Sequence, residues 1–204
     1  QTQLEEVGYE CEYLEAGAPN RGNVFARLPG ADPSRGALMI HGHLDVVPAD
    51  PADWSVHPFS GAVSDGYVWG RGAVDMKDMD AMILAAVRHL ARNGTVPPRD
   101  LVVVFFADEE AGGTKGSHFL VAEHPDMFEG VTEAISEVGG YSVTVTDSDG
   151  TERRTYLLQT AEKGISWMRL TAHGRAGHGS VPNDENAIVR LAEAIARIAA
   201  HKWP

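Results

Sequence analysis

The sequence predicts an α/β fold with a mostly parallel central sheet and flanking helices, followed by the start of an α+β unit. The unbroken apolar run at 101–106 is typical of a central strand that is covered on both faces. Apolar residues at helical spacing between 79 and 90 predict an amphipathic helix just before that strand. Beyond residue 142, alternating segments replace this strand–helix–strand order, which indicates a change of architecture there.

The first part of the chain is expected to hold short strands separated by turns. Residues 1–10 read as the tail of a helix that runs into a strand, so we expect the chain to begin within a domain. Strands are predicted at 9–14 and 23–28, on either side of a turn-rich segment, and a short buried strand at 37–40. An Asp-Gly pair between two short β-prone runs predicts a tight hairpin over 62–69.

The helix predicted between 79 and 90 should bury one stripe of apolar side chains. A second helix is expected at about 116–123 and a short strand at 134–136. The predicted stripe consists of Met79, Met82, Ile83, Ala86, Val87 and Leu90.

The last part of the chain is predicted to continue with strands and one helix. Segments 142–146 and 156–160 should form a hairpin, and 165–171 a further strand. Apolar residues between 188 and 198 predict an amphipathic helix, which Asn183 or Asp184 would cap.

Composition excludes several classes of protein. The net charge of −12 and the lack of a Lys/Arg cluster argue against a nucleic-acid-binding surface. No apolar run reaches membrane-spanning length, so no membrane partner is expected. The single cysteine, Cys11, rules out a disulfide framework and a thiolate zinc site, and we expect it to be a small buried side chain.

Metal-ligating residue types gather at predicted strand ends and glycine-rich turns. Because parallel strands end at one edge of a sheet, these groups can converge there. Converged carboxylates repel one another unless a cation neutralises them, and one imidazole with several carboxylates suits zinc, with cobalt or manganese as alternatives. Each cluster alone is more easily explained as a helix cap or a solvated loop, but together they predict a metal site. The clusters are His43 with Asp45, Asp75, Glu109 with Glu110, and Glu137.

Four motifs in this order resemble the M20 metallopeptidases, a family that includes carboxypeptidases, dipeptidases, acetylornithine deacetylase and succinyl-diaminopimelate desuccinylase. The segment 54–61 and Glu-Lys-Gly at 162–164 are most similar to the carboxypeptidase S-like branch. The resemblance implies a zinc exopeptidase-like fold. The motifs are His-x-Asp-Val-Val-Pro at 43–48, Gly-Arg-Gly-x-x-Asp-Met-Lys at 70–77, Asp-Glu-Glu at 108–110 and Ser-Glu-x-Gly-Gly at 136–140.

The resemblance implies a centre with two zinc ions. His43 and Glu137 would bind the first ion, and Asp75 would bridge both, with a cis peptide bond following it. Glu110 would bind the second ion, and Asp45 would orient the ring of His43.

The resemblance also implies how the reaction is carried out. Glu109 would be the general base that takes a proton from the attacking water. His178 would stabilise the oxyanion from a lid or dimerisation domain, often in the partner subunit, so a homodimer through the lid is implied. On this interpretation, 1–162 form the N-terminal part of the catalytic domain and 163–204 the truncated start of the lid.

Several alternatives for the function stay open. The family's second metal takes a further His from beyond the lid, so we expect the chain to be a fragment of a longer enzyme. That enzyme would hydrolyse amide bonds in small peptides, or it would be an N-acyl amino acid deacylase or desuccinylase. The chain as given would be inert or weakly active with a partial metal site. An M28-type aminopeptidase fits the motifs less well, and the cytoplasm is the default location.

Overall fold

The computed structural model describes residues 1–17, 19–137, 142–161, 164 and 166–202. The chain forms two compact units, residues 1–159 and 160–204, and each is described by itself. The assignment of 1–162 to a catalytic domain and of 163–204 to a lid stays a prediction.

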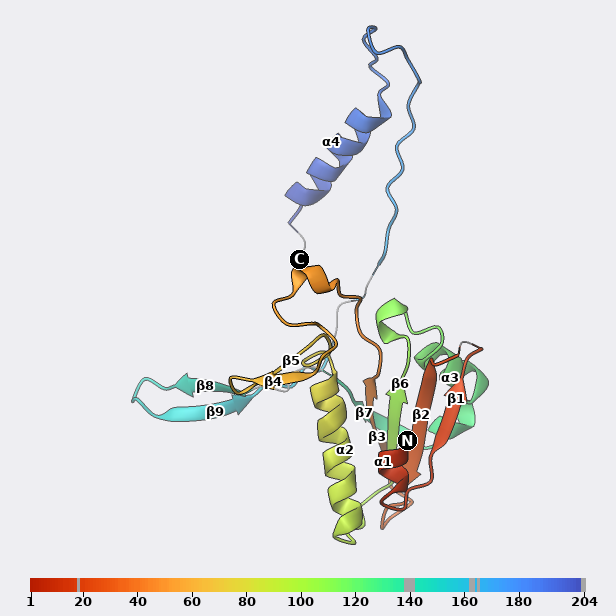
Figure 1. The fold of residues 1–204 in the computed structure, drawn as a ribbon, viewed down its shortest axis with the longest axis vertical. Helices are drawn as coiled ribbons and strands as arrows, with labels where there is room; N and C mark the ends of the chain where they lie inside the picture. The colour runs from red at the N-terminus through yellow and green to blue at the C-terminus, as the bar shows by residue number, and fades with distance from the viewer. Residues whose placement is uncertain (18, 138–141, 162–163, 165, 203–204) are drawn as a thin grey trace. The chain divides into compact units, whose positions relative to one another are not determined.

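A five-stranded mixed sheet organises the first unit, in the order β1-β2-β6-β3-β7 (Figure 1). β3 pairs in parallel with β6 and β7, whereas β2 is antiparallel to both β6 and β1. The expectation of a mostly parallel sheet is therefore wrong for its β1–β2 side, because an apolar run encodes burial and not strand direction. The strands are β1 (Glu12–Glu15), β2 (Gly22–Leu28), β3 (Ala37–His43), β6 (Leu101–Phe106) and β7 (Val131–Ile135).

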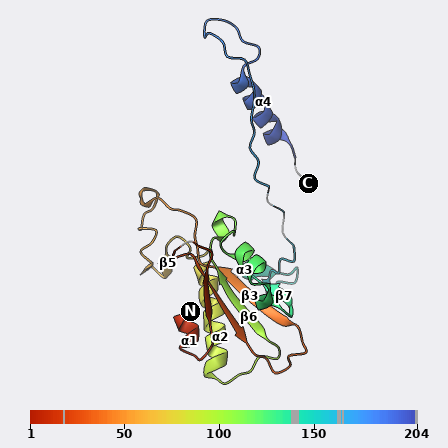
Figure 2. The same cartoon turned by 90° about the vertical axis from the view of Figure 1, so that its right-hand side faces the viewer.

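Helices cover both faces of this sheet (Figure 2). Leu101, Val103 and Phe105 of β6 pack with α1 (Thr2–Glu5) and α2 (Lys77–Arg92), and the alternate residues of β6 pack with α3 (Ser117–Glu123) and the 3₁₀ helix η3 (Pro125–Phe128). All six residues of β6 are buried, which confirms the prediction of a central strand covered on both faces.

Helix α2 buries a stripe that differs from the predicted one. Ile83 and Val87 are buried as expected, but Met82 is 51% exposed and Ala86 also faces solvent. Asp80 takes a core position instead and is only 5% exposed. The period of the helix was correct, but its phase was set by tertiary packing, which placed a carboxylate in the apolar stripe.

Connections carry shorter elements, several of them as predicted. The loop between β3 and α2 contains a 3₁₀ helix, η1 (Pro51–Asp53), and the hairpin of β4 (Ala62–Ser64) and β5 (Tyr67–Trp69). The Arg71 guanidinium lies 5.3 Å from the centre of the Trp54 ring, which gives this loop an ordered contact.

A second hairpin joins β8 (Ser142–Thr146) to β9 (Glu152–Tyr156). Its second strand was predicted at 156–160, which is wrong. Thr146 pairs with Glu152 directly across the turn, and the Asp147 N–H donates to the Thr151 carbonyl at 2.9 Å. A turn this tight sets the register, so the second strand begins immediately after it.

The second unit contains helix α4 (Ala187–Ala200). Its cap is Asn186, whose Oδ1 accepts N–H bonds from the first turn, and neither Asn183 nor Asp184 takes this place. Asn183 instead donates to the Arg175 carbonyl at 2.7 Å. The described residues 166–171 form no strand, contrary to the prediction, because a strand needs a partner and no described segment of this unit supplies one. No helix in the described ranges has the length and apolar character required to cross a bilayer.

Candidate metal centre

The candidate site lies at the carboxyl ends of three parallel strands. His43 is the last residue of β3, η2 (Glu109–Ala111) follows β6, and Glu137 follows β7. Asp75 precedes the first turn of α2, at the same edge. The predicted convergence of the acidic clusters is therefore present, since their atoms form two groups around His43. These are His43 with Asp75 and Glu137, and His43 with Glu109 and Glu110, each with its ligand atoms within 4.8 Å of one another.

His43 is the buried centre of this arrangement, with 3% exposure. Its Nδ1 lies 3.0 Å from the backbone carbonyl oxygen of Asp45. Its Nε2 lies 3.1 Å from Asp75 Oδ1, 3.1 Å from Glu137 Oε2 and 3.8 Å from Glu109 Oε2. A carbonyl oxygen only accepts, so Nδ1 carries a proton and the lone pair of a neutral ring points from Nε2 toward the carboxylates.

The donor set fits a divalent metal. When His43 is neutral, its Nε2 is a hydrogen-bond acceptor that faces carboxylate oxygens, also acceptors, at 3.1 Å. Only a proton or another cation between these atoms removes the repulsion between them. Tetrahedral zinc with bonds of about 2.0–2.2 Å holds its ligand atoms roughly 3.3 Å apart, close to the observed spacing. One imidazole with carboxylates is also a donor set that zinc and its neighbours accept.

The electrostatics of the site show the same need for a cation. Burial lowers the pKa of His43, but the hydrogen bond to Asp45 and the nearby carboxylates of Glu137 and Glu109 outweigh it, so the pKa is raised. Burial and neighbouring carboxylates raise the pKa of Glu110 and of Glu137, although His43 opposes the increase. Each group thus holds its proton more tightly than it does in water.

Asp45 fixes two parts of the site at once. Its carbonyl holds the His43 ring, while its carboxylate Oδ1 lies 3.6 Å from Nδ1. The carboxylate mainly accepts the backbone N–H groups of Glu109 and Glu110, each at 3.0 Å. The group of Asp45 that hydrogen-bonds the ring is therefore its backbone carbonyl, and its side chain connects β3 to the loop after β6.

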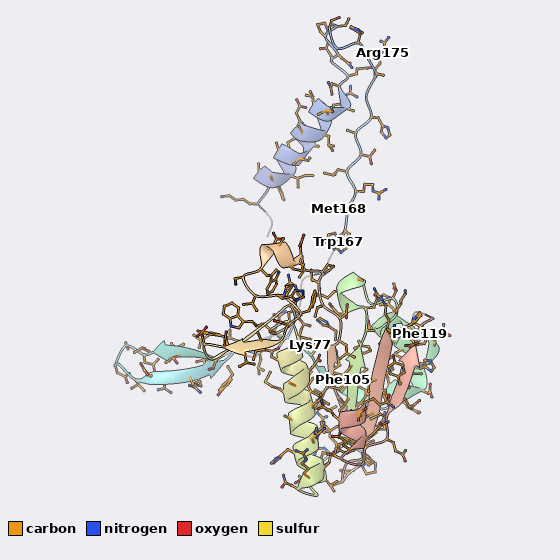
Figure 3. All side chains as sticks on the ribbon, viewed as in Figure 1. Lys77, Phe105, Phe119, Trp167, Met168 and Arg175 are labelled. Atoms are coloured by element: carbon orange, nitrogen blue, oxygen red, sulfur yellow. The ribbon has the colours of Figure 1, made fainter. Side chains whose placement is uncertain are left out.

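The start of α2 lies directly against the end of β3. The Asp75–Met76 peptide bond is cis, as the family resemblance implied. Met76 is buried, and its sulfur accepts the His43 N–H at 3.1 Å. Lys77, at the first turn of α2 (Figure 3), donates from Nζ to the Leu44 carbonyl rather than to a carboxylate of the centre.

Sequence analysis missed Asp80, a buried carboxylate beneath this site. A Cβ on Gly42 would lie 2.5 Å from Asp80 Oδ1, so the carboxylate sits against the strand that ends in His43. Neither oxygen has a hydrogen-bond partner among the described residues, and burial raises the pKa of Asp80 to about 6. The available signal was an Asp three and seven residues before Ile83 and Val87, at the spacing of the buried stripe.

A cleft of about 520 Å³ adjoins the centre on the side of β1 and β2. Asp45 and Glu110 line it together with Tyr13, Arg21 and Pro48. This is space in which a small substrate could approach the second group of ligand atoms.

Among the described residues, no histidine other than His43 belongs to either group of ligand atoms, and the histidines beyond residue 159 lie in the other unit. His41 contacts Ser136 Oγ at 3.2 Å and packs edge-on against Phe106, and burial lowers its pKa. His178 lies in the unit of residues 160–204, where its Nδ1 lies 2.9 Å from Ser180 Oγ. Its predicted role as an oxyanion donor stays a prediction.

Comparisons with known proteins place this geometry in a family. Residues 39–202 match the model of "Peptidase family M20/M25/M40". The chain is 34% identical over 178 residues to the N-fatty-acyl-amino acid synthase/hydrolase PM20D1 of Xenopus tropicalis, covering 87% of this chain and 34% of that protein. It is 31% identical over 198 residues to aminoacylase-1 of Sus scrofa, covering 97% of this chain and 46% of that protein.

Among solved structures, human carnosine dipeptidase 1 is similar, with a TM-score of 0.59 and 26% identity over 70% of this chain and 34% of that one. An M20 metallo-carboxypeptidase of Sulfolobus solfataricus, at 22% identity and a TM-score of 0.58, shares the fold. The chain thus spans between a third and a half of the length of these curated relatives.

Proposed function

Because the chain belongs to peptidase family M20/M25/M40, a family of hydrolases, we propose that it serves the metal-dependent hydrolysis of amide bonds in small peptides or N-acyl amino acids. The observation that carries this proposal is the Nε2 lone pair of buried His43, which faces the carboxylates of Asp75 and Glu137 at 3.1 Å. A shared divalent cation would bind the lone pair of the imidazole and offset the negative charges of both carboxylates at once.

The residues of the centre would hold two ions. His43, Asp75 and Glu137 would bind the first, and Asp75 and Glu110 the second, with zinc as the expected metal. Bound ions of this kind polarise the amide carbonyl and allow water to act as a nucleophile at neutral pH. We expect the first ion to bind more tightly, because its ligands include the buried imidazole.

Glu109 would act as the general base. Its carboxylate reaches within 3.8 Å of His43 Nε2 yet its side chain is 58% exposed, so it lies at the centre and remains open to substrate. It would accept the proton of the attacking water and pass it to the leaving amine. Asp45 would keep Glu109 in place through the N–H bond that its carboxylate accepts.

His178 would supply a hydrogen bond to the developing oxyanion, either in its own subunit or in a homodimeric partner. In the longer, active enzyme, we expect His178→Ala to lower kcat by roughly 10²–10³-fold with metal content unchanged. His173, an exposed histidine of the same unit, is the control, and His173→Ala should leave kcat as it is. Equal effects of the two substitutions would remove His178 from the mechanism.

N-acyl amino acids are the substrate class that the relatives favour. The two sequence relatives, at 31–34% identity, are named for acyl-amino acid or aminoacylase activities, while the dipeptidase is 26% identical. Simple dipeptides are the second candidate. Hydrolysis rates measured side by side on N-acyl amino acids and on dipeptides would rank these classes, and faster dipeptide cleavage would reverse the preference.

Zinc titration of the metal-free 204-residue protein tests the proposal without depending on turnover. Calorimetry should show zinc uptake that His43→Ala abolishes. His89→Ala is the matched control, because His89 is an exposed histidine on α2 whose Nε2 lies 3.1 Å from Asn93 Nδ2. If the native protein takes up no zinc, or His89→Ala weakens uptake as much as His43→Ala, the proposed metal centre is wrong.

A further inference from the structure

Two arginine–aspartate pairs tie β2 to β6 at opposite ends of the same antiparallel pairing. Arg27 Nη1 lies 3.1 Å from Asp100 Oδ2, next to the start of β6. Arg21, just before β2, contacts Asp108 Oδ1, just after β6. Of the two pairs, only Arg21 and Asp108 lie at the edge that carries the candidate metal centre.

Asp108 is the anchor of the loop that follows β6. Its side chain is only 4% exposed, and its Oδ2 accepts hydrogen bonds from the Thr114 hydroxyl at 3.1 Å and the Lys115 N–H at 3.2 Å. Its carbonyl accepts the Gly113 N–H at 2.6 Å. Arg21 provides the only full positive charge in contact with this carboxylate among the described residues.

The backbone of Asp108 needs such support. Its φ of +67° lies in the left-handed region, which is uncommon for non-glycine residues although aspartate adopts it more readily than most, so contacts of its side chain help to hold it there. This conformation turns the chain at the end of β6, so the next two residues, Glu109 and Glu110, lead back toward His43. Any change in the torsion angles of Asp108 would redirect both carboxylates.

The loop is fixed on its other side by Asp45, whose carboxylate accepts the N–H groups of Glu109 and Glu110. Below it, buried Asn23 accepts the Ala107 N–H at 2.9 Å and donates to the Lys115 carbonyl at 2.9 Å. These contacts close both ends of the loop. Within them, the Arg21 contact is the one made by a half-exposed side chain that can be changed without opening the core.

We propose that Arg21 is a positioning residue for the metal centre, holding Asp108 so that Glu109 and Glu110 face His43. The expected effect on zinc binding rests on the proposed function, whereas the effect of Arg21 on the loop after β6 does not. Arg21 carries its effect through Asp108 and does not touch the ligand atoms. Its planar guanidinium suits this task, because it forms directed hydrogen bonds that an ammonium group does not reproduce.

Hydrogen exchange of the metal-free protein tests the structural half of the proposal. Arg21→Gln should speed amide exchange in peptides covering 107–115. Arg27→Gln, which breaks the pair at the other end of the same strands, should leave those peptides protected. If Arg21→Gln exchanges like the native protein there, or Arg27→Gln loosens the same peptides equally, the proposal is overturned.

Zinc affinity tests the functional half. Outer residues that orient metal ligands typically change metal affinity about 10–100-fold when they are replaced, and we expect a loss in this range for Arg21→Gln and none for Arg27→Gln. Arg21→Lys should fall between Arg21→Gln and the native protein. Arg27→Gln loses its ion pair and also the hydrogen bonds that Arg27 donates to the Met127 and Glu129 carbonyls, so its unfolding midpoint should fall at least as far as that of Arg21→Gln. A greater loss of zinc affinity in Arg21→Gln would therefore reflect positioning and not stability.

The two halves fail separately. If the native protein binds no zinc while Arg21→Gln alone loosens 107–115, the proposed function is wrong and the positioning contact stands. If zinc binds but Arg21→Gln and Arg27→Gln have the same affinity, the metal centre stands and the positioning role is wrong. Arg21→Lys keeps the test valid should Arg21→Gln unfold, since it retains the charge and must still weaken zinc binding relative to Arg27→Gln.

Discussion

Acidic side chains at the amino ends of the parallel strands differ from those around His43 at the carboxyl ends in what neutralises them. At the amino ends, Asp100 and Glu133 are each paired with an arginine, Arg27 and Arg99 respectively. At the carboxyl ends, no lysine or arginine of the described residues forms an ion pair with the carboxylates around His43. The carboxylates of Asp100 and Glu133 are thus neutralised by arginines of the chain, whereas those around His43 would rely on a cation from outside.

The strongest test of this contrast replaces one glutamate at each end. Glu109→Gln should lower kcat of the active enzyme by about 10²–10⁴-fold, because an amide keeps the shape of the side chain but accepts no proton. Glu133→Gln, at the amino ends, should leave kcat unchanged. Metal content, measured by atomic absorption, should stay near native in both.

A reversed outcome would identify an error in the assignment of roles. If Glu109→Gln strips the metal and Glu110→Gln spares it while abolishing turnover, then Glu110 is the base and Glu109 the ligand.

Stability against pH should sharpen the contrast further. Asp80 has its pKa raised by burial from 3.8 to about 6. The folded state therefore favours its protonated form, and this stabilisation is complete below pH 3.8 and is lost as the pH rises through about 6. The difference corresponds to about 3 kcal/mol in the free energy of unfolding. The raised pKa values of Glu110, Glu137 and His43 act with the same sign, whereas the pKa of His41, which burial lowers, acts with the opposite sign.

Urea unfolding of the metal-free protein at pH 4.5 and pH 7.5 measures this effect. The native protein should be more stable at the lower pH, and Asp80→Asn should reduce the difference, because an amide does not titrate in this range. Zinc should stabilise the protein chiefly at the higher pH, where its ligands are deprotonated. A native protein that gains stability from pH 4.5 to 7.5 without metal would contradict this reading of the site.

Replacing one carboxylate that holds a loop at each end of the parallel strands should show whether zinc affinity depends on the positions of Glu109 and Glu110 or only on the stability of the fold. Asp45→Asn should weaken zinc binding about 10–100-fold, because its carboxylate accepts the N–H groups that hold Glu109 and Glu110. Asp100→Asn is a matched control, since Asp100 also accepts a loop N–H, from Gly30 at 2.9 Å. Calorimetry should find native zinc affinity in Asp100→Asn, and equal losses would show that zinc binding merely follows stability.

The fold was predictable from the sequence where local patterns decide it. The hairpin over 62–69 and the strand at 101–106 follow from a turn signal and an apolar run, and the structure has both where they were predicted. The antiparallel course of β2 was not predictable, because strand direction depends on pairing between distant segments. The exposure of Met82 and the burial of Asp80 have the same cause, since packing against the sheet sets the phase of α2.

The candidate site was predictable to the extent that its residues stand at strand ends. His43, Glu109, Glu110 and Glu137 were named from this rule and Asp75 from a glycine-rich turn that leads into a helix, and the structure brings them together. The contact between Arg21 and Asp108 joins residues 87 positions apart and has no local signal. The family resemblance named ligands, a base and Asp45 as the residue that orients His43, whereas the contact of Arg21 with Asp108 came only from the folded structure.

The smallest expected effect concerns the arginine pair at the amino ends. Glu133 is 59% exposed in its pair with Arg99, so solvent screens the charges and the pair should stabilise the fold by only about 0.2–1 kcal/mol. Arg99→Gln should therefore lower the unfolding free energy slightly, by an amount that shrinks in high salt, and should leave zinc affinity unchanged. If Arg99→Gln weakened zinc binding instead, charge at the amino ends would reach the metal centre across the sheet. The two ends would then form one electrostatic system, and the separation on which the other tests depend would not hold.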